Sequence, residues 1–178
     1  ILSSSVDIEI DATYTDVGNA TNLGSAGPAN WYQGSSITGA DQTSAWYAVA
    51  LANSIDGVDH NGAASEISAN FNSNAGVNWY FGTDANPGAG EYDFVSVVMH
   101  EIGHGLGFLS LVQDDGTWNG GPSIYDYFVE DAVTGDIFPD MSVAERLDAI
   151  TSQTQANQLS WNGAFGVDAA GGSNPILY

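Results

Sequence analysis

The stretch "VVMHEIGHGLGFLS", residues Val97–Ser110, is the most informative part of the sequence. Apolar residues recur in and just before it at helical spacing, and Asp93 stands where an N-cap residue is expected. The pattern predicts a helix that is deeply buried along one side, with Phe94, Val97, Val98 and Ile102 as its apolar positions.

His100 and His104 are four residues apart, so a helix places them on one face, one turn above the other. Their imidazole nitrogens can then bind a single Zn²⁺ at about 2.0–2.1 Å. Glu101 is displaced by about 100° around the helix, too far to ligate but within reach of a water on the metal. The spacing therefore predicts two zinc ligands and a general base.

The segment "HEIGHGLG" resembles the zincin peptidases, and Gly107 stands three residues after His104, where the metzincin clan breaks its helix. From about Asp41 to Phe128 the chain also resembles bacterial secreted metalloproteases. The resemblance implies a zincin-like fold, proteolytic activity and a tight turn at Gly107. It further implies a third zinc ligand three residues later, but this chain has Ser110 there.

A serine hydroxyl is a poor zinc ligand, so the third ligand is expected elsewhere. Asp126, in the ordered-looking segment "SIYDYF", is the first choice, and the resemblance gives weight to the carboxylates nearest the motif, because aspartate replaces histidine in some metzincins. Asp114 and Asp115, which are nearer the motif, Glu130 and His60 are the other candidates within the chain. A further segment of the enzyme's own precursor, beyond Tyr178, is the remaining source considered.

Further site residues are left open by the sequence. Met141 is the one methionine after the motif and is either a Met-turn residue beneath the metal or a hydrophobic staple before a helix. Tyr125, Tyr127 and Tyr178 are each available to stabilise an oxyanion. The loops "DANPGAGEYD" and "QDDGTWNGG" offer oxygen ligands for Ca²⁺ without the spacing of an EF-hand.

The charge balance is extreme, with 22 acidic side chains against one basic residue, Arg146, and a formal charge of -21. Such a chain repels nucleic acid and anionic membranes, which excludes both as partners. Salt or bound calcium would relieve the self-repulsion, so we expect a halophilic or marine source, calcium sites, or both. The absence of cysteine and the resemblance together suggest a protein secreted by a bacterium.

The predicted organisation is one α+β catalytic domain over residues 1–178 with a mixed or antiparallel sheet. Its N-terminal part, about 1–109, holds the sheet and the active helix, and a smaller C-terminal part, about 110–178, completes the cleft. Strands are expected at residues 5–11 and 65–73. Helices are expected at residues 43–57, with Thr43 or Ser44 as the cap and Gly57 at the end, and at residues 142–151, with a capping box of Ser142 and Glu145.

The predicted function is zinc-dependent endopeptidase hydrolysis of protein or peptide substrates, with Glu101 as the general base. Two alternatives stay open. One is a catalytically impaired zincin-fold module that only binds peptide, which Ser110 favours and Glu101 disfavours. The other is a zinc hydrolase that acts on a non-peptide amide or ester.

Overall fold

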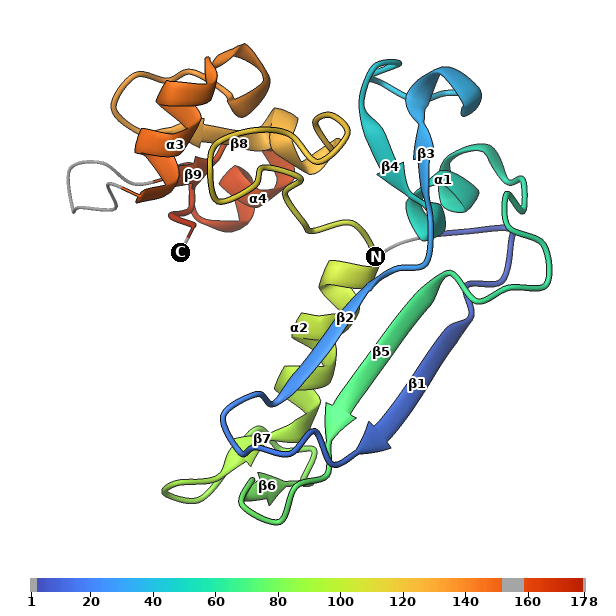
Figure 1. Ribbon diagram of the computed structural model, residues 1–178, viewed down its shortest axis with the longest axis vertical. Helices are drawn as coiled ribbons and strands as arrows, with labels where there is room; N and C mark the ends of the chain where they lie inside the picture. The colour runs from blue at the N-terminus through green and yellow to red at the C-terminus, as the bar shows by residue number, and fades with distance from the viewer. Residues whose placement is uncertain (1–2, 152–158, 178) are drawn as a thin grey trace. The chain divides into compact units, whose positions relative to one another are not determined.

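The computed structural model describes residues 3–151 and 159–177 and has a mixed α+β architecture, which confirms the predicted class (Figure 1). Its residues form two compact units. Unit 1 consists of Ile1–Thr43 and Tyr47–Phe108, and unit 2 consists of Ser44–Trp46 and Leu109–Tyr178. The chain enters unit 2 briefly at Ser44–Trp46 and again at Leu109, a few residues after the helix that carries the histidine motif.

The sheet of unit 1 has the strand order β1-β5-β2. The strands are β1 (Ile10–Thr15), β5 (Ile67–Asn72) and β2 (Gly24–Pro28). Because β5 runs parallel to β1 and antiparallel to β2, the sheet is mixed. On β5, Ile67, Ala69 and Phe71 are buried, as the alternation in the sequence predicts.

The first strand begins later than expected. Residues 5–9 are not a strand, and β1 starts at Ile10 with all six of its residues exposed. The reason is the pairing with β5: Ile10 faces Ile67, while the Glu9 carbonyl accepts the N–H groups of Glu66 and Ile67. Register with a distant strand, rather than local alternation, sets where β1 begins.

Helix α1 (Val49–Asp56) is shorter than the predicted helix. Its C-terminal glycine, Gly57, has φ 70° and caps the helix as expected. The predicted capping by Thr43 or Ser44 is wrong, because Trp46–Ala48 form strand β4 instead. Trp46 donates its N–H to the Pro122 carbonyl and accepts from Ile124, and these long-range bonds override a helical start.

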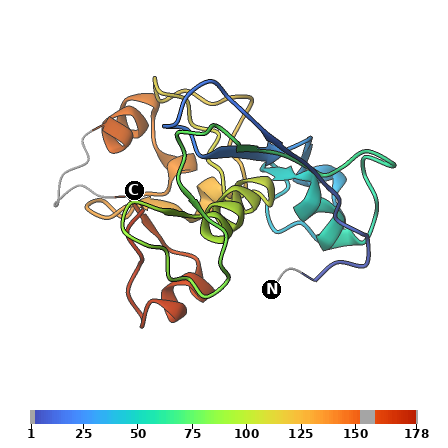
Figure 2. The same ribbon diagram turned by 90° about the horizontal axis from the view of Figure 1, so that it is seen from below.

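Helix α2 (Phe94–Gly105) carries the motif and lies along the sheet of unit 1 beside β2 and β5 (Figures 1 and 2). A Cβ at Gly105 would lie 2.3 Å from Ile67 Cγ2, so glycine permits this close approach. The predicted side is confirmed but its depth is not: Phe94, Val97, Val98 and Ile102 are half-buried, and within α2 only Gly105 is fully buried. Gly105 thus lets the helix pack directly on Ile67 of β5.

The remaining strands of unit 1 are short. They are β3 (Trp31–Gln33), which precedes the 3-10 turn Gly34–Ser36, and the parallel pair β6 (Trp79–Tyr80) and β7 (Tyr92–Asp93). Strand β7 leads directly into α2. Asp93 occupies the N-cap position, but its Oδ2 accepts a hydrogen bond from Ser96 Oγ at 2.6 Å and not from a backbone N–H.

Unit 2 contains the antiparallel pair β8 (Val129–Asp131) and β9 (Leu159–Trp161) with helices α3 (Val143–Thr151) and α4 (Ala164–Ala169). Single 3-10 turns occupy Tyr125–Phe128 and Phe138–Asp140. The capping box is confirmed, since Ser142 N donates to Glu145 Oε2 at 2.7 Å and Glu145 N donates to Ser142 Oγ at 3.3 Å. The core consists of Val129, Phe138, Met141 and Ala149.

Membrane insertion through a helix finds no support in the fold. Of the helices in the described residues, none has the length and apolar character needed to cross a bilayer.

Candidate metal centre

The two histidines of α2 converge on one point. His100 Nε2 and His104 Nε2 lie 3.0 Å apart, and their rings are perpendicular with centroids separated by 4.6 Å. Two nitrogens that bind one tetrahedral zinc ion at about 2.0–2.1 Å are separated by roughly 3.3 Å. The observed spacing is close to this value, so the pair fits two ligands of a zinc ion.

The orientation of His104 is fixed by the backbone that follows the helix. His104 Nδ1 lies 2.8 Å from the Phe108 carbonyl oxygen, which can only accept, so Nδ1 carries the proton. Nε2 therefore keeps its lone pair for a metal ion. Metal-binding histidines are commonly held in this way, by a second hydrogen bond to a carbonyl or carboxylate.

Gly107 brings that carbonyl into place. It is buried and has φ 103°, a conformation that a side chain disfavours, and its N–H donates to the His104 carbonyl in the turn that ends α2. A Cβ at this position would lie 3.2 Å from Ala48 Cβ. The predicted turn at Gly107 is confirmed, and its consequence is the contact between Phe108 and His104.

Glu101 lies between the histidine face and the sheet. Its Cγ is beside Gly24 on β2, where an added Cβ would be 3.4 Å away. No residue in the described part of the chain hydrogen-bonds to its carboxylate. A half-buried carboxylate with its oxygens uncommitted is suited to accept a proton from a water.

Among residues 3–151 and 159–177, no third histidine, aspartate or glutamate joins this pair in a group that could hold a metal ion. The third ligand stays a prediction. The candidates named from the sequence each have contacts of their own, which bear on how available they are.

Asp126 and Ser110, the two residues considered for the third-ligand role, are bonded to each other in unit 2. Ser110 Oγ donates to Asp126 Oδ1 at 2.6 Å. Asp126 is fully buried, and its Oδ2 accepts from Leu111 N, Ser123 N and Ser123 Oγ at 3.2, 2.7 and 2.8 Å. Burial raises the pKa of Asp126 above its ordinary range, against the lowering effect of these donors. These contacts hold together the start of unit 2, and metal binding by Asp126 would have to replace them.

Asp114 and Asp115 lie in an exposed turn of unit 2. Asp115 Oδ1 accepts from the Thr117 hydroxyl at 2.6 Å and from Thr117 N at 3.0 Å, and these bonds lower the pKa of Asp115. In the other predicted calcium loop, Asp84 accepts from the Tyr80 hydroxyl and from Asn86 N. Both loops use carboxylates to close their own turns, which is the usual role of aspartate there.

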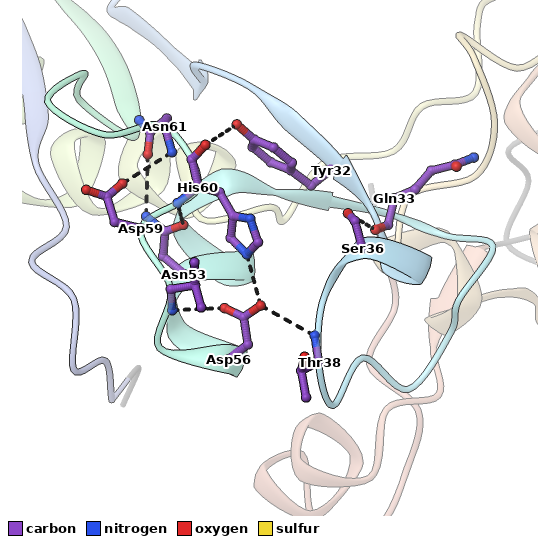
Figure 3. A network of polar contacts seen from close by, with 10 residues as sticks. Tyr32, Gln33, Ser36, Thr38, Asn53, Asp56, Asp59, His60 and Asn61 are labelled. Atoms are coloured by element: carbon purple, nitrogen blue, oxygen red, sulfur yellow. Dashed lines mark hydrogen bonds and ion pairs between the residues drawn. The ribbon is translucent and has the colours of Figure 1, made fainter.

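His60 belongs to a polar network after α1 in unit 1 (Figure 3). Its Nε2 lies 3.0 Å from Asp56 Oδ2, and its carbonyl accepts a hydrogen bond from Tyr32. Burial works to raise the pKa of Asp56, but the Val58 N–H together with His60 outweighs it and holds that pKa below its ordinary range. The imidazole is engaged in closing this loop.

The structure also describes Met141, Tyr125 and Tyr127, whose roles the sequence left open. Met141 is buried in the unit 2 core, as a staple residue would be. Tyr127 Oη lies 3.0 Å from Ser44 Oγ, and burial raises the pKa of Tyr125. Tyr178 lies outside the described residues. The sequence did not identify the Phe108 carbonyl or Gly24 as parts of the site. The predicted turn at Gly107 was the one local signal that pointed to the Phe108 carbonyl.

Comparison with known proteins gives one match. A sequence model of a family described as SPBPB7E8-like matches residues 5–167, which is most of the chain. No curated protein and no solved structure matches the chain.

Proposed function

This chain belongs to the SPBPB7E8-like family, and we propose that it is a zinc-dependent endopeptidase. The observation that supports the proposal best is the convergence of His100 Nε2 and His104 Nε2 to 3.0 Å on a helix face beside an uncommitted glutamate. Zinc, when bound, polarises a peptide carbonyl and acidifies water. We propose a zincin-like arrangement for the domain on the same basis.

In this proposal each residue of the site has a distinct role in peptide hydrolysis. His100 and His104 hold the ion, and the Phe108 carbonyl orients His104 through Nδ1–H. Glu101 removes a proton from the attacking water and delivers it to the amine that leaves when the peptide bond breaks. The third ligand remains part of the proposal: the sequence favours Asp126, whereas its hydrogen bonds from Ser110 and Ser123 favour another candidate. Secretion from a bacterial cell and bound calcium also remain proposals.

The geometry also bears on the alternative of a module that binds peptide without cleaving it. A zinc site with only a structural role needs no base beside the metal. Glu101 occupies that position with no hydrogen bond from any described residue. The arrangement therefore favours the enzyme over the binding module.

The proposal is tested by zinc analysis and casein cleavage with the wild type, Glu101→Gln and a matched control, Glu9→Gln. Glu9 is an exposed glutamate of the same unit. We expect Glu101→Gln to keep its zinc and lose activity by about 10²–10⁴-fold, as for a general base, while Glu9→Gln matches the wild type. Unchanged cleavage by Glu101→Gln would refute the role of Glu101. Zinc binding without cleavage in the wild type would favour the binding module, and cleavage of esters alone would favour the non-peptide hydrolase.

A further inference from the structure

Six aromatic rings gather where β7 enters α2; Figure 1 shows this end of the helix beside β6 and β7. Phe94, the first residue of α2, is central: its ring centroid lies 5.1–6.0 Å from those of Tyr14, Phe71, Trp79 and Phe81. Tyr92 joins through Trp79 at 6.4 Å. The contacts are mostly edge-to-face, the geometry that stabilises aromatic pairs.

Three of these rings face solvent. Phe81 is 61% exposed, Tyr14 50% and Tyr92 48%. We call these three residues the aromatic patch. Rings that serve only as core are normally covered, whereas exposed ring faces at one place offer binding area for apolar groups or cations.

Three carboxylates, from Asp84, Glu91 and Asp93, lie beside the patch. The hydrogen bond to Asp84 raises the pKa of Tyr80, burial adds to the shift, and so do the charges of Asp84, Asp93 and Glu91. The backbone and hydrogen bonds place them there as well: Tyr80 pairs with Asp93 between β6 and β7, its hydroxyl donates to Asp84, and Glu91 directly precedes Tyr92 of the patch. Asp93 Oδ1 is also buried without a hydrogen-bond partner among the described residues.

The chain itself cannot neutralise these charges. Arg146 is the one Lys or Arg residue in the sequence. It belongs to unit 2, is 4% exposed, and its guanidinium binds the carbonyls of Gly116, Phe138 and Met141 and stacks 4.4 Å from the centre of the Trp118 ring. Asp84 bonds within its loop through Oδ1 and Glu91 through Oε2, so each of these carboxylates keeps one oxygen for a positive partner, whereas Asp93 has one oxygen bonded to Ser96 and the other buried.

We propose that the aromatic patch, with Asp84, Glu91 and Asp93, is a docking surface for a lysine- or arginine-rich segment of a partner polypeptide. Ring faces attract ammonium and guanidinium groups, and adjacent carboxylates add charge complementarity. An acidic or purely apolar partner would leave the carboxylates unpaired. Docking needs neither zinc nor Glu101, so it goes beyond the proposed function and is measurable without it.

The test is fluorescence anisotropy with labelled decapeptides bound to the full chain carrying Glu101→Gln, which prevents cleavage. The peptides are a lysine-rich sequence and versions with glutamine or glutamate in place of lysine. We expect the lysine peptide to bind about tenfold more tightly than the glutamine peptide at low salt, and the preference to shrink as salt is added. Equal binding of the lysine and glutamine peptides would overturn the proposal.

Substitutions in and near the aromatic patch test whether the lysine peptide binds there. We expect Asp84→Asn with Glu91→Gln to weaken lysine-peptide binding by about tenfold, and Phe81→Ala to weaken it severalfold. The matched control is Asp41→Asn with Asp136→Asn, which removes the same charge at two exposed positions elsewhere and should stay within about twofold of the parent. Equal loss in the control would mean that net charge, and not this surface, attracts the peptide. Circular dichroism confirms that each variant is folded.

Discussion

The polar groups at the start of unit 2 and those on the histidine face of α2 in unit 1 are used in opposite ways. In unit 2, the Asp126 carboxylate accepts hydrogen bonds from Ser110, Leu111 and Ser123, and the Arg146 guanidinium binds three carbonyls. In unit 1, two imidazole nitrogens of α2 face each other, and Glu101 accepts no hydrogen bond from the described residues.

This difference separates polar residues that hold the fold from polar residues that are free to act. A buried polar group is costly unless it is paired, so unit 2 satisfies its groups internally. The histidine face keeps lone pairs and a carboxylate accessible, which contributes little to stability but allows ligand binding and proton transfer. Changes in unit 2 should therefore affect stability first, and changes on the histidine face should affect chemistry first.

The largest stability effect is expected from Arg146→Met. The change leaves the carbonyls of Gly116, Phe138 and Met141 without their donor and removes the stacking on Trp118. We expect a loss of about 3 kcal/mol in the free energy of unfolding, measured in urea. Leu147→Met, at the exposed neighbouring position, is the control and should change it by less than about 0.5 kcal/mol.

Asp126→Asn tests a residue that stabilises unit 2 and was also predicted from the sequence as a metal ligand. The amide NH₂ would face donors from Ser110 or Ser123, so we expect a loss of about 2 kcal/mol in unfolding free energy with zinc content retained. Urea denaturation and metal analysis measure the two effects. Lost zinc with unchanged stability would instead identify Asp126 as the third ligand.

Gly105→Ala and Gly103→Ala form a matched pair within α2. Alanine at 105 would collide with Ile67, and we expect it to destabilise unit 1 by about 1–3 kcal/mol. Nothing lies within 4 Å of a Cβ at Gly103, so alanine there should stabilise the helix by about 0.5–1 kcal/mol. Thermal unfolding of both variants gives the comparison, and a stable Gly105→Ala protein would contradict the packing of α2 on β5.

The smallest effect concerns the capping box of α3. Hydrogen bonds from Ser142 N and the Ser142 hydroxyl lower the pKa of Glu145 from its ordinary value of 4.5. A carboxyl whose pKa is lower in the folded state stabilises above its unfolded pKa, and the contribution is lost as pH falls through the folded pKa. We expect the denaturation midpoint to drop less between about pH 7 and about pH 3 in Glu145→Gln than in the wild type. An equal drop in both proteins would contradict a role for Glu145.

The sequence predicted elements whose signals are local. Helix α2, the strand around Phe71, the Gly57 cap and the capping box of Ser142 and Glu145 follow from periodicity and capping within a few residues. Elements that depend on distant partners were misplaced. Strand β1 begins where it pairs with β5, and Trp46 is extended because it bonds to Pro122 and Ile124.

The same distinction between local and long-range signals applies to the candidate site. The face shared by His100 and His104, and the place of Glu101 beside it, follow from four-residue spacing on a helix. The pairing of Ser110 with Asp126 spans 16 residues and requires the folded turn of unit 2, so no local pattern reveals it. The contact of His104 with the Phe108 carbonyl depends on the backbone conformation of Gly107, which spacing alone does not specify.

The central claim is that the histidine face of α2 binds zinc, and the most direct measurement is zinc content after dialysis of the wild type, His104→Asn and His60→Asn. His60 is the matched control, a histidine of the same unit that is bonded to Asp56. We predict that the wild type and His60→Asn retain equal amounts of zinc and that His104→Asn loses it. Zinc retained by His104→Asn, or lost from His60→Asn instead, would contradict the assignment.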